Sequence, residues 1–270
     1  MDAKTAFDRV DSAYETCKGP ALEQALQAVA ADCAAENGED SPLYAAVCSE
    51  LGGYYRGQAR YAESEAAFLR AIDILGKTVG EASPDYTTAL NNLAGTYRVM
   101  KEYEKAEQIF RRCLERYEHT LGTGHVLYAS GLNNYALVCL DRGDLDRAEA
   151  LLGRSAEVLA GLPECMDEYA AALCNRSALL LRLHRAAEAV PLLEKAVGLF
   201  EMELGTDTPH YHAALHSLGL AHLQQNENAE AADRFFAAAC AAETLYGPEH
   251  PEAQAIRRSL AEARRRMEEP

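Results

Sequence analysis

The chain has 270 residues and a formal net charge of −16, which comes from 42 acidic and 26 basic side chains. This acidity argues against sequence-independent binding of nucleic acid, because the neutralisation of phosphates requires a basic face. The sequence has no apolar stretch that predicts a membrane span and no apolar segment near its N-terminus that predicts secretion. We therefore expect a cytoplasmic protein without nucleic-acid or membrane partners.

Residues 1–38 predict a degenerate pair of helices. The second helix is predicted by apolar residues that lie 42 positions ahead of matching residues in the next segment, namely Leu22, Leu26 and Val29. Phe7, Val10 and Tyr14 recur at three- and four-residue steps and predict the first helix, one residue out of register with the segments that follow.

From residue 39 the sequence repeats itself with a period of about 42 residues. The clearest marker is a tyrosine that returns at gaps of 42, 42, 41 and 42 residues, at Tyr44, Tyr86, Tyr128, Tyr169 and Tyr211. A period this steady predicts an array of one supersecondary unit. We divide residues 39–248 into five such units, at about 41–82, 83–124, 125–165, 166–207 and 208–248.

The unit at 83–124 shows the internal pattern of the repeat. Apolar side chains recur every three or four residues in two stretches, 86–97 and 106–117, which predicts two amphipathic helices. Ser83 and Pro84 are typical of a helix start, and Gly122 is typical of a helix end. One position of the first helix always holds a small residue, which predicts close helix contact: Gly52, Ala94, Ala136, Ser177 and Gly219.

The segment His250–Pro251–Glu252 is expected to start one more helix, which runs to about Glu268 and carries Arg257, Arg258, Arg264, Arg265 and Arg266. Repeat arrays need a polar cap on their last exposed face. We interpret residues 249–270 as that cap, with an acidic partner for the arginines as the alternative.

The spacing of these residues resembles that of tetratricopeptide repeats, in the 42-residue form found in kinesin light chains, at Leu90, Leu93, Ala94, Tyr97, Ala106, Phe110 and Cys113. The resemblance covers residues 41–248. It implies an all-α fold, a right-handed superhelical solenoid of antiparallel helix pairs with a C-terminal capping helix. Two features depart from the family pattern: Arg176 stands in a position that is usually apolar, and Leu162–Pro163 replaces the usual Leu–Gly ending.

Stacked helix pairs form a concave groove that is lined mainly by the first helix of each unit. Asn92, Asn134 and Asn175 share one position in this groove, and Asn91 and Asn133 precede two of them. Each amide offers a donor and an acceptor, as does the backbone of an extended peptide. In related arrays such asparagines hold a peptide backbone, and the resemblance implies the same here. The alternative is that these amides tie neighbouring helices together.

Arg56 and Arg98 lie nearly two helical turns after this column and are expected to face the same groove. They suit a bidentate pair with a carboxylate of a bound peptide. The alternative is that they bond to Glu50 or to other local acids. The same position becomes leucine in the later units, so we expect a bound peptide with an acidic end and a hydrophobic end.

The sequence predicts no cofactor, no metal site and no catalytic residues. His212 and His216 lie four residues apart on one helix face, but no Glu or Cys at a matching offset supplies a third metal ligand. The eight cysteines form no CxxC pair, and we interpret them as small buried hydrophobes. No known catalytic or phosphate-binding motif is present. Arg176 either turns into the groove or meets an acid such as Asp141, because an unpaired charge in a packing position is costly.

We therefore predict a protein–protein interaction scaffold, not an enzyme, that binds an extended peptide or a segment of a partner protein in its groove. One alternative is a peptide-sensing regulator, in which a ligand changes the pitch of the superhelix. Another is a structural protein that associates with itself through its end units. The sequence leaves the oligomeric state open.

Overall fold

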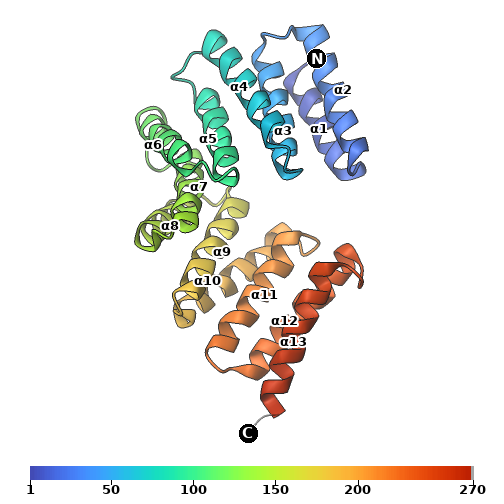
Figure 1. Ribbon diagram of the computed structural model, residues 1–270, viewed down its shortest axis with the longest axis vertical. Coiled ribbons are helices and arrows are strands. Elements are labelled where there is room, and N and C mark those ends of the chain that lie inside the picture. Colours follow the sequence, from blue (N-terminus) through green and yellow to red (C-terminus); the bar gives the residue numbers. More distant parts are fainter. Residues whose placement is uncertain (269–270) are drawn as a thin grey trace. The chain divides into compact units, whose positions relative to one another are not determined.

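The computed structural model describes residues 1–268, and over that range the chain forms only helices and their connections. The all-α fold is thereby confirmed (Figure 1). The last two residues of the expected cap, 269–270, lie outside the described residues. The helices are α1 (Ala3–Thr16), α2 (Pro20–Asn37), α3 (Pro42–Gly57), α4 (Tyr61–Thr78), α5 (Pro84–Val99), α6 (Tyr103–Thr120), α7 (Val126–Arg142), α8 (Leu145–Leu159), α9 (Met166–Arg182), α10 (Ala186–Leu199), the π-helical segment η1 (Phe200–Leu204), α11 (Pro209–Gln224), α12 (Asn228–Tyr246) and α13 (Pro251–Glu268).

The chain divides into two compact units, Met1–Val138 and a second that begins at Cys139, so the boundary falls within α7. In the first unit each helix from α1 to α6 packs on the next one along the chain, and α3 also contacts α5. In the second unit the same holds from α8 to α13, and α9 also contacts α11. This pattern of neighbour contacts is that of stacked helical hairpins. The finer division of the chain at residues 39 and 249 stays a prediction.

The helix starts and ends follow the expected local chemistry. The hydroxyl of Ser83 accepts a hydrogen bond of 3.2 Å from the backbone N–H of Tyr86, and Pro84 occupies the first turn of α5. Such a cap satisfies one of the free N–H groups at a helix start. Gly122, which follows α6, has a φ of 83°, a conformation that residues with a Cβ atom rarely adopt.

The apolar stripe of α1 differs from the expected one. Ala6, Val10 and Ala13 are buried, whereas Phe7 and Tyr14 are 37% and 43% exposed. Phe7, Val10 and Tyr14 thus lie in one helix, as expected, but of the three only Val10 belongs to its buried face. The small alanines let α1 approach its neighbours, and this rotation turns Phe7 toward a pocket that α3 and α5 also line.

Among residues 1–268, no helix combines the length and the hydropathy that crossing a bilayer requires.

Candidate functional site

A polar pocket of about 330 Å³ lies between α3, α5, α6 and α7 in the first unit. It brings together five of the seven predicted site residues: Arg56, Asn91, Asn92, Arg98 and Asn134. Gly53, Gly57, Gly95, Val99, Phe110 and Leu137 complete its lining. We call this cavity the arginine pocket.

Arg56 is fixed in the arginine pocket by its surroundings. Its Nη1 donates a hydrogen bond of 3.1 Å to the backbone carbonyl of Asn92, and its Cζ lies 5.9 Å from the ring centre of Phe68. A Cβ atom at Gly95 would lie only 2.8 Å from Nη1, so the missing side chain of Gly95 makes room for the guanidinium group. Arg56 therefore bonds to the main chain, and the expected alternative, a bond to Glu50, is not what the structure shows.

Burial and a neighbouring positive charge both act on Arg56 in the arginine pocket. Burial lowers the pKa of Arg56 from its ordinary value, and the positive charge of Arg98 lowers it further. Both effects disfavour the charged form, and the second one shows that the two guanidinium groups repel each other. An anion between them would relieve this repulsion.

Asn91 supplies an unpaired acceptor in the same pocket. Its side chain is 6% exposed, and its Oδ1 has no hydrogen-bond partner within residues 1–268. Leaving a buried acceptor unpaired costs about 1–3 kcal/mol.

Two predicted residues lie outside the arginine pocket. Asn133 on α7 is half-buried and takes part in an interaction within the protein. Asn175 lies on α9 in the second unit, where it is also half-buried and engaged. The column of asparagines therefore contributes Asn92 and Asn134 to one described pocket.

A second, mostly apolar pocket of about 430 Å³ adjoins the arginine pocket, because Asn92 lines both. Its other lining residues are Ala3 and Phe7 of α1, Pro42, Leu43, Ala46, Ser49 and Glu50 of α3, Leu75 of α4, and Asp85, Thr88 and Ala89 of α5. We call it the apolar pocket. Burial raises the pKa of the Glu50 carboxyl from its ordinary value, and the negative charge of Asp11 adds to this rise.

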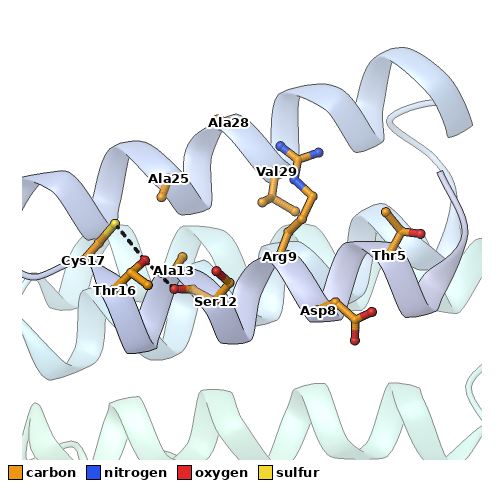
Figure 2. A pocket seen from close by; sticks show the side chains of 10 residues that line it. All are labelled: Thr5, Asp8, Arg9, Ser12, Ala13, Thr16, Cys17, Ala25, Ala28 and Val29. Carbon is orange, nitrogen blue, oxygen red and sulfur yellow. Dashed lines mark hydrogen bonds between the residues drawn. The ribbon is translucent and has the colours of Figure 1, made fainter.

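A further pocket of about 450 Å³ lies between α1 and α2 (Figure 2). Arg9 leans across it and forms an ion pair of 2.8 Å with Asp32. Its other lining residues are small, such as Ala25 and Ala28, and none of the predicted site residues is among them. None of its lining residues has a buried polar side-chain atom without a hydrogen-bond partner within residues 1–268, so we do not assign a ligand to it.

Arg176 is half-buried on α9, and its Nε has no hydrogen-bond partner within residues 1–268. Its charge helps to lower the pKa of Glu188 on α10, although Arg185 lowers that pKa more strongly. Arg176 thus lies near enough to Glu188 for its charge to act on that carboxyl. In the part of the chain that the structure describes, no three His, Cys, Asp or Glu side chains gather as they would around a metal ion.

Comparison with known families decides the identity of the repeats. A family model described as tetratricopeptide repeat matches residues 85–160 and 168–241, which is more than half of the chain, and a second model of the same description matches residues 45–85. The chain is a tetratricopeptide repeat protein. The resemblance of its sequence to tetratricopeptide repeats is thereby confirmed.

Solved structures of tetratricopeptide repeat proteins share this fold. A kinesin light chain-like protein of Podosopora anserina with nearly identical TPR-like repeats gives a TM-score of 0.61 at 19% identity, over 76% of this chain and 98% of that one. A Rap protein complexed with Competence and Sporulation Factor gives 0.64 at 14% identity, over 99% and 87% of the two chains. Yeast Tom70 gives a TM-score of 0.68 at 17% identity, over 98% of this chain and 47% of that one. A search of curated proteins finds no match.

Proposed function

We propose that this tetratricopeptide repeat protein is a protein–protein interaction scaffold that binds an extended peptide segment of its partner on the inner faces of α3, α5 and α7. Tetratricopeptide repeats generally mediate protein–protein interactions, through the extended surfaces that stacked repeats present. The observation that carries the proposal is the arginine pocket, which Arg56 and Arg98 line together with Asn91, Asn92 and Asn134.

An acidic residue of a peptide would suit the two arginines that line the arginine pocket. Its carboxylate would pair with Arg56 and Arg98, and charge-assisted hydrogen bonds of this kind are about twice as strong as neutral ones. The amides of Asn92 and Asn134 would hold the main chain on either side, since each offers both a donor and an acceptor.

The apolar pocket would accept a neighbouring hydrophobic side chain of the same peptide. It shares Asn92 with the arginine pocket, so a chain held at Asn92 reaches both. Phe7, Leu43 and Leu75 supply apolar area, and burying a side chain of leucine size there contributes about 1.5–3 kcal/mol. The proposed ligand therefore combines one acidic and one hydrophobic residue.

Two glycines of the arginine pocket allow a matched test. Gly95→Ala would place a Cβ atom 2.8 Å from Nη1 of Arg56 and displace the guanidinium group, whereas a Cβ atom at Gly53 meets nothing within 4 Å. Both substitutions raise helix propensity by a similar amount. The probe is an array of synthetic peptides that carry one Asp or Glu and one Leu or Phe at varied spacing.

We expect wild type and Gly53→Ala to bind a subset of acidic peptides, and Gly95→Ala to bind that subset at least about tenfold more weakly, the loss of about 1.4 kcal/mol that one charge-assisted contact supplies. Versions of the peptides with Asn or Gln in place of the acid should bind weakly to all three proteins. Equal binding of acidic and amide peptides, or equal binding by the two variants, contradicts the proposal.

A peptide-sensing regulator is the second candidate. The observation in its favour is the similarity to a Rap protein whose structure was solved with Competence and Sporulation Factor. Small-angle scattering with and without a bound peptide distinguishes the two candidates, because a sensor changes its radius of gyration and a rigid scaffold keeps it. Light scattering at two protein concentrations tests self-association.

A further inference from the structure

Three histidines gather where α13 packs near α11 and α12 in the second unit. His212 on α11 is 1% exposed, and its ring meets that of Tyr246 on α12 edge-on, with the ring centres 5.5 Å apart. Tyr246 stacks in turn on His250, directly ahead of α13, at 4.4 Å. One turn further along α11, Nε2 of His216 lies 3.0 Å from Oγ of Ser259 on α13. We call His212, His216 and His250 the histidine cluster.

His212 has no hydrogen-bond partner for either ring nitrogen within residues 1–268. A neutral imidazole has one donor and one acceptor, whereas the protonated ring has two donors and a charge. Burying that charge without an acceptor is far more costly than burying the neutral ring. The packed arrangement therefore tolerates only the neutral form of His212.

The surroundings of His212 disfavour its protonated form. Burial is the main cause that lowers its pKa, and the charges of His210 and His250 lower it further, whereas Glu252 on α13 raises it. The pKa of His216 is lowered by burial first and by His212 next, again with Glu252 as the one opposing group. Glu252 is exposed, so its charge is screened by solvent.

Charged side chains on the other elements near α11 face other groups. Asp167 and Glu168 of α9 line a pocket with His210. Lys195 of α10 lies over a tyrosine ring of α9, with Nζ 4.8 Å from the ring centre. Glu201 of η1 accepts a hydrogen bond of 3.0 Å from a tyrosine hydroxyl of α11. On α12, the Glu243 carboxylate is paired with Arg257 of α13 at 2.6 Å.

We propose that the histidine cluster makes the packing of α13 on α11 and α12 sensitive to mild acid, so that α13 is held at neutral pH and released when His212 takes up a proton. The packed form binds this proton more weakly than the released form, in which the ring has an ordinary pKa of about 6.5. The stabilisation of the packed form is therefore complete above about pH 6.5 and declines as the pH falls below it.

The small apolar face of α13 makes release feasible. Its buried side chains are Ala253, Ile256, Leu260 and Ala263, of which only two are larger than alanine. Leu260 packs in one apolar cluster with Phe235, which is fully buried. Release of α13 would expose this cluster and create a hydrophobic surface that is absent at neutral pH.

His222 provides a built-in control on the same helix. It is 8% exposed, but its Nδ1 lies 2.7 Å from a carboxylate oxygen of Glu227. Nδ1 of His222 thus has a carboxylate partner, whereas neither ring nitrogen of His212 has a partner within residues 1–268. The pH response should depend on His212 and not on His222.

Hydrogen–deuterium exchange of the full chain between pH 7.5 and pH 5.5, corrected for the intrinsic exchange rate, measures the release directly. We expect the protection of residues 251–268 to fall by up to about tenfold at pH 5.5, the factor for one site that titrates near pH 6.5 in the released form. Peptides from α3 to α5 serve as the internal reference. His212→Phe keeps a ring against Tyr246 without a titrating group and should reduce the change to the part that His216 contributes, while His222→Phe should retain all of it.

A change of less than twofold in wild-type α13 overturns the proposal, whatever the variants do. It is also overturned if His222→Phe removes the pH-dependent loss of protection in residues 251–268, or if His212→Phe leaves that loss at its full size. If His212→Phe fails to fold, the fluorescence of 8-anilinonaphthalene-1-sulfonate, which reports exposed hydrophobic surface, is measured in its place. It should rise at pH 5.5 in wild type and in His222→Phe. No rise then counts against the proposal.

Discussion

Two buried glycines set how closely paired helices approach. A Cβ atom at Gly52 on α3 would lie 2.9 Å from the ring of Phe68 on α4, and one at Gly219 on α11 would lie 2.6 Å from the ring of Phe235 on α12. Both rings are fully buried, so neither can move into solvent. The small residue that recurs in every unit is therefore required for the contact between the two helices of a pair.

Gly219→Ala is expected to lower the free energy of unfolding by about 1–3 kcal/mol, because it overpacks a closed core. Gly198→Ala on α10 is the control, since a Cβ atom there meets nothing within 4 Å and the gain in helix propensity is the same. Urea unfolding of both variants measures the difference. Equal stability of the two would show that the Phe235 ring can shift at no cost.

In contrast to these glycines, two residues of the candidate site have arrangements that do not stabilise the fold. Oδ1 of Asn91 is a buried acceptor without a partner within residues 1–268. Burial lowers the pKa of the Arg56 guanidinium group, which means that burial disfavours its charged form. Neither arrangement helps folding. Residues that break local rules in this way concentrate where a protein meets a ligand, which is why these two carry the proposed binding function.

At the scale of helices, the inner faces of α5 and α7 are expected to contribute to binding and little to stability. Asn92 and Asn134 line the arginine pocket and are only partly buried. Replacing both with alanine should change the free energy of unfolding by less than about 1 kcal/mol, as surface substitutions do. The same double variant should bind the acidic peptides at least about tenfold more weakly, a loss of about 1.4 kcal/mol.

Asn175→Ala is the matched control for that double variant, because Asn175 occupies the equivalent position on α9, outside the arginine pocket. It should leave peptide binding unchanged. A loss of about 2–5 kcal/mol of stability in the double variant, as for core truncations, would instead identify the asparagines as residues that hold helices together.

Features that depend on one helix at a time could be predicted from the sequence. The cap at Ser83, the early Pro84 and the helix end at Gly122 each follow from the local chemistry of a few residues. Arg56 and Arg98 could be placed together because the 42-residue period puts them in equivalent positions of neighbouring units. The 42-residue period was therefore sufficient to predict the fold and part of the candidate site.

Features that depend on how a helix is rotated about its axis could not be predicted. The spacing of Phe7, Val10 and Tyr14 predicted a helix but not its orientation: Ala6, Val10 and Ala13 form the buried face of α1, and Phe7 lines the apolar pocket. That pocket draws residues from α1, α3, α4 and α5, which are spread over some ninety positions of sequence. Its apolar side chains differ little in type from those of the core, so no pattern in the sequence distinguished them.

At the scale of the whole molecule, the contacts of each helix are almost entirely with its neighbours along the chain. Stability in such an array is approximately a sum of the stabilities of its repeats and of the interfaces between adjacent repeats. The division of the chain into two compact units, the second beginning at Cys139, fits this view. A local defect should therefore have local consequences.

Leu26→Ala tests this expectation, because Leu26 on α2 is fully buried in a cluster with Val10, Val29 and Val47. The substitution should cost about 2–5 kcal/mol at that cluster. Hydrogen–deuterium exchange should then rise by at least about tenfold in α1 to α3 and stay unchanged in α9 to α12, a result of neighbour-limited coupling. Leu69→Ala on α4, where the side chain is 47% exposed, is the control and should alter neither region. A uniform rise across all the helices would mean that the chain unfolds as one cooperative body.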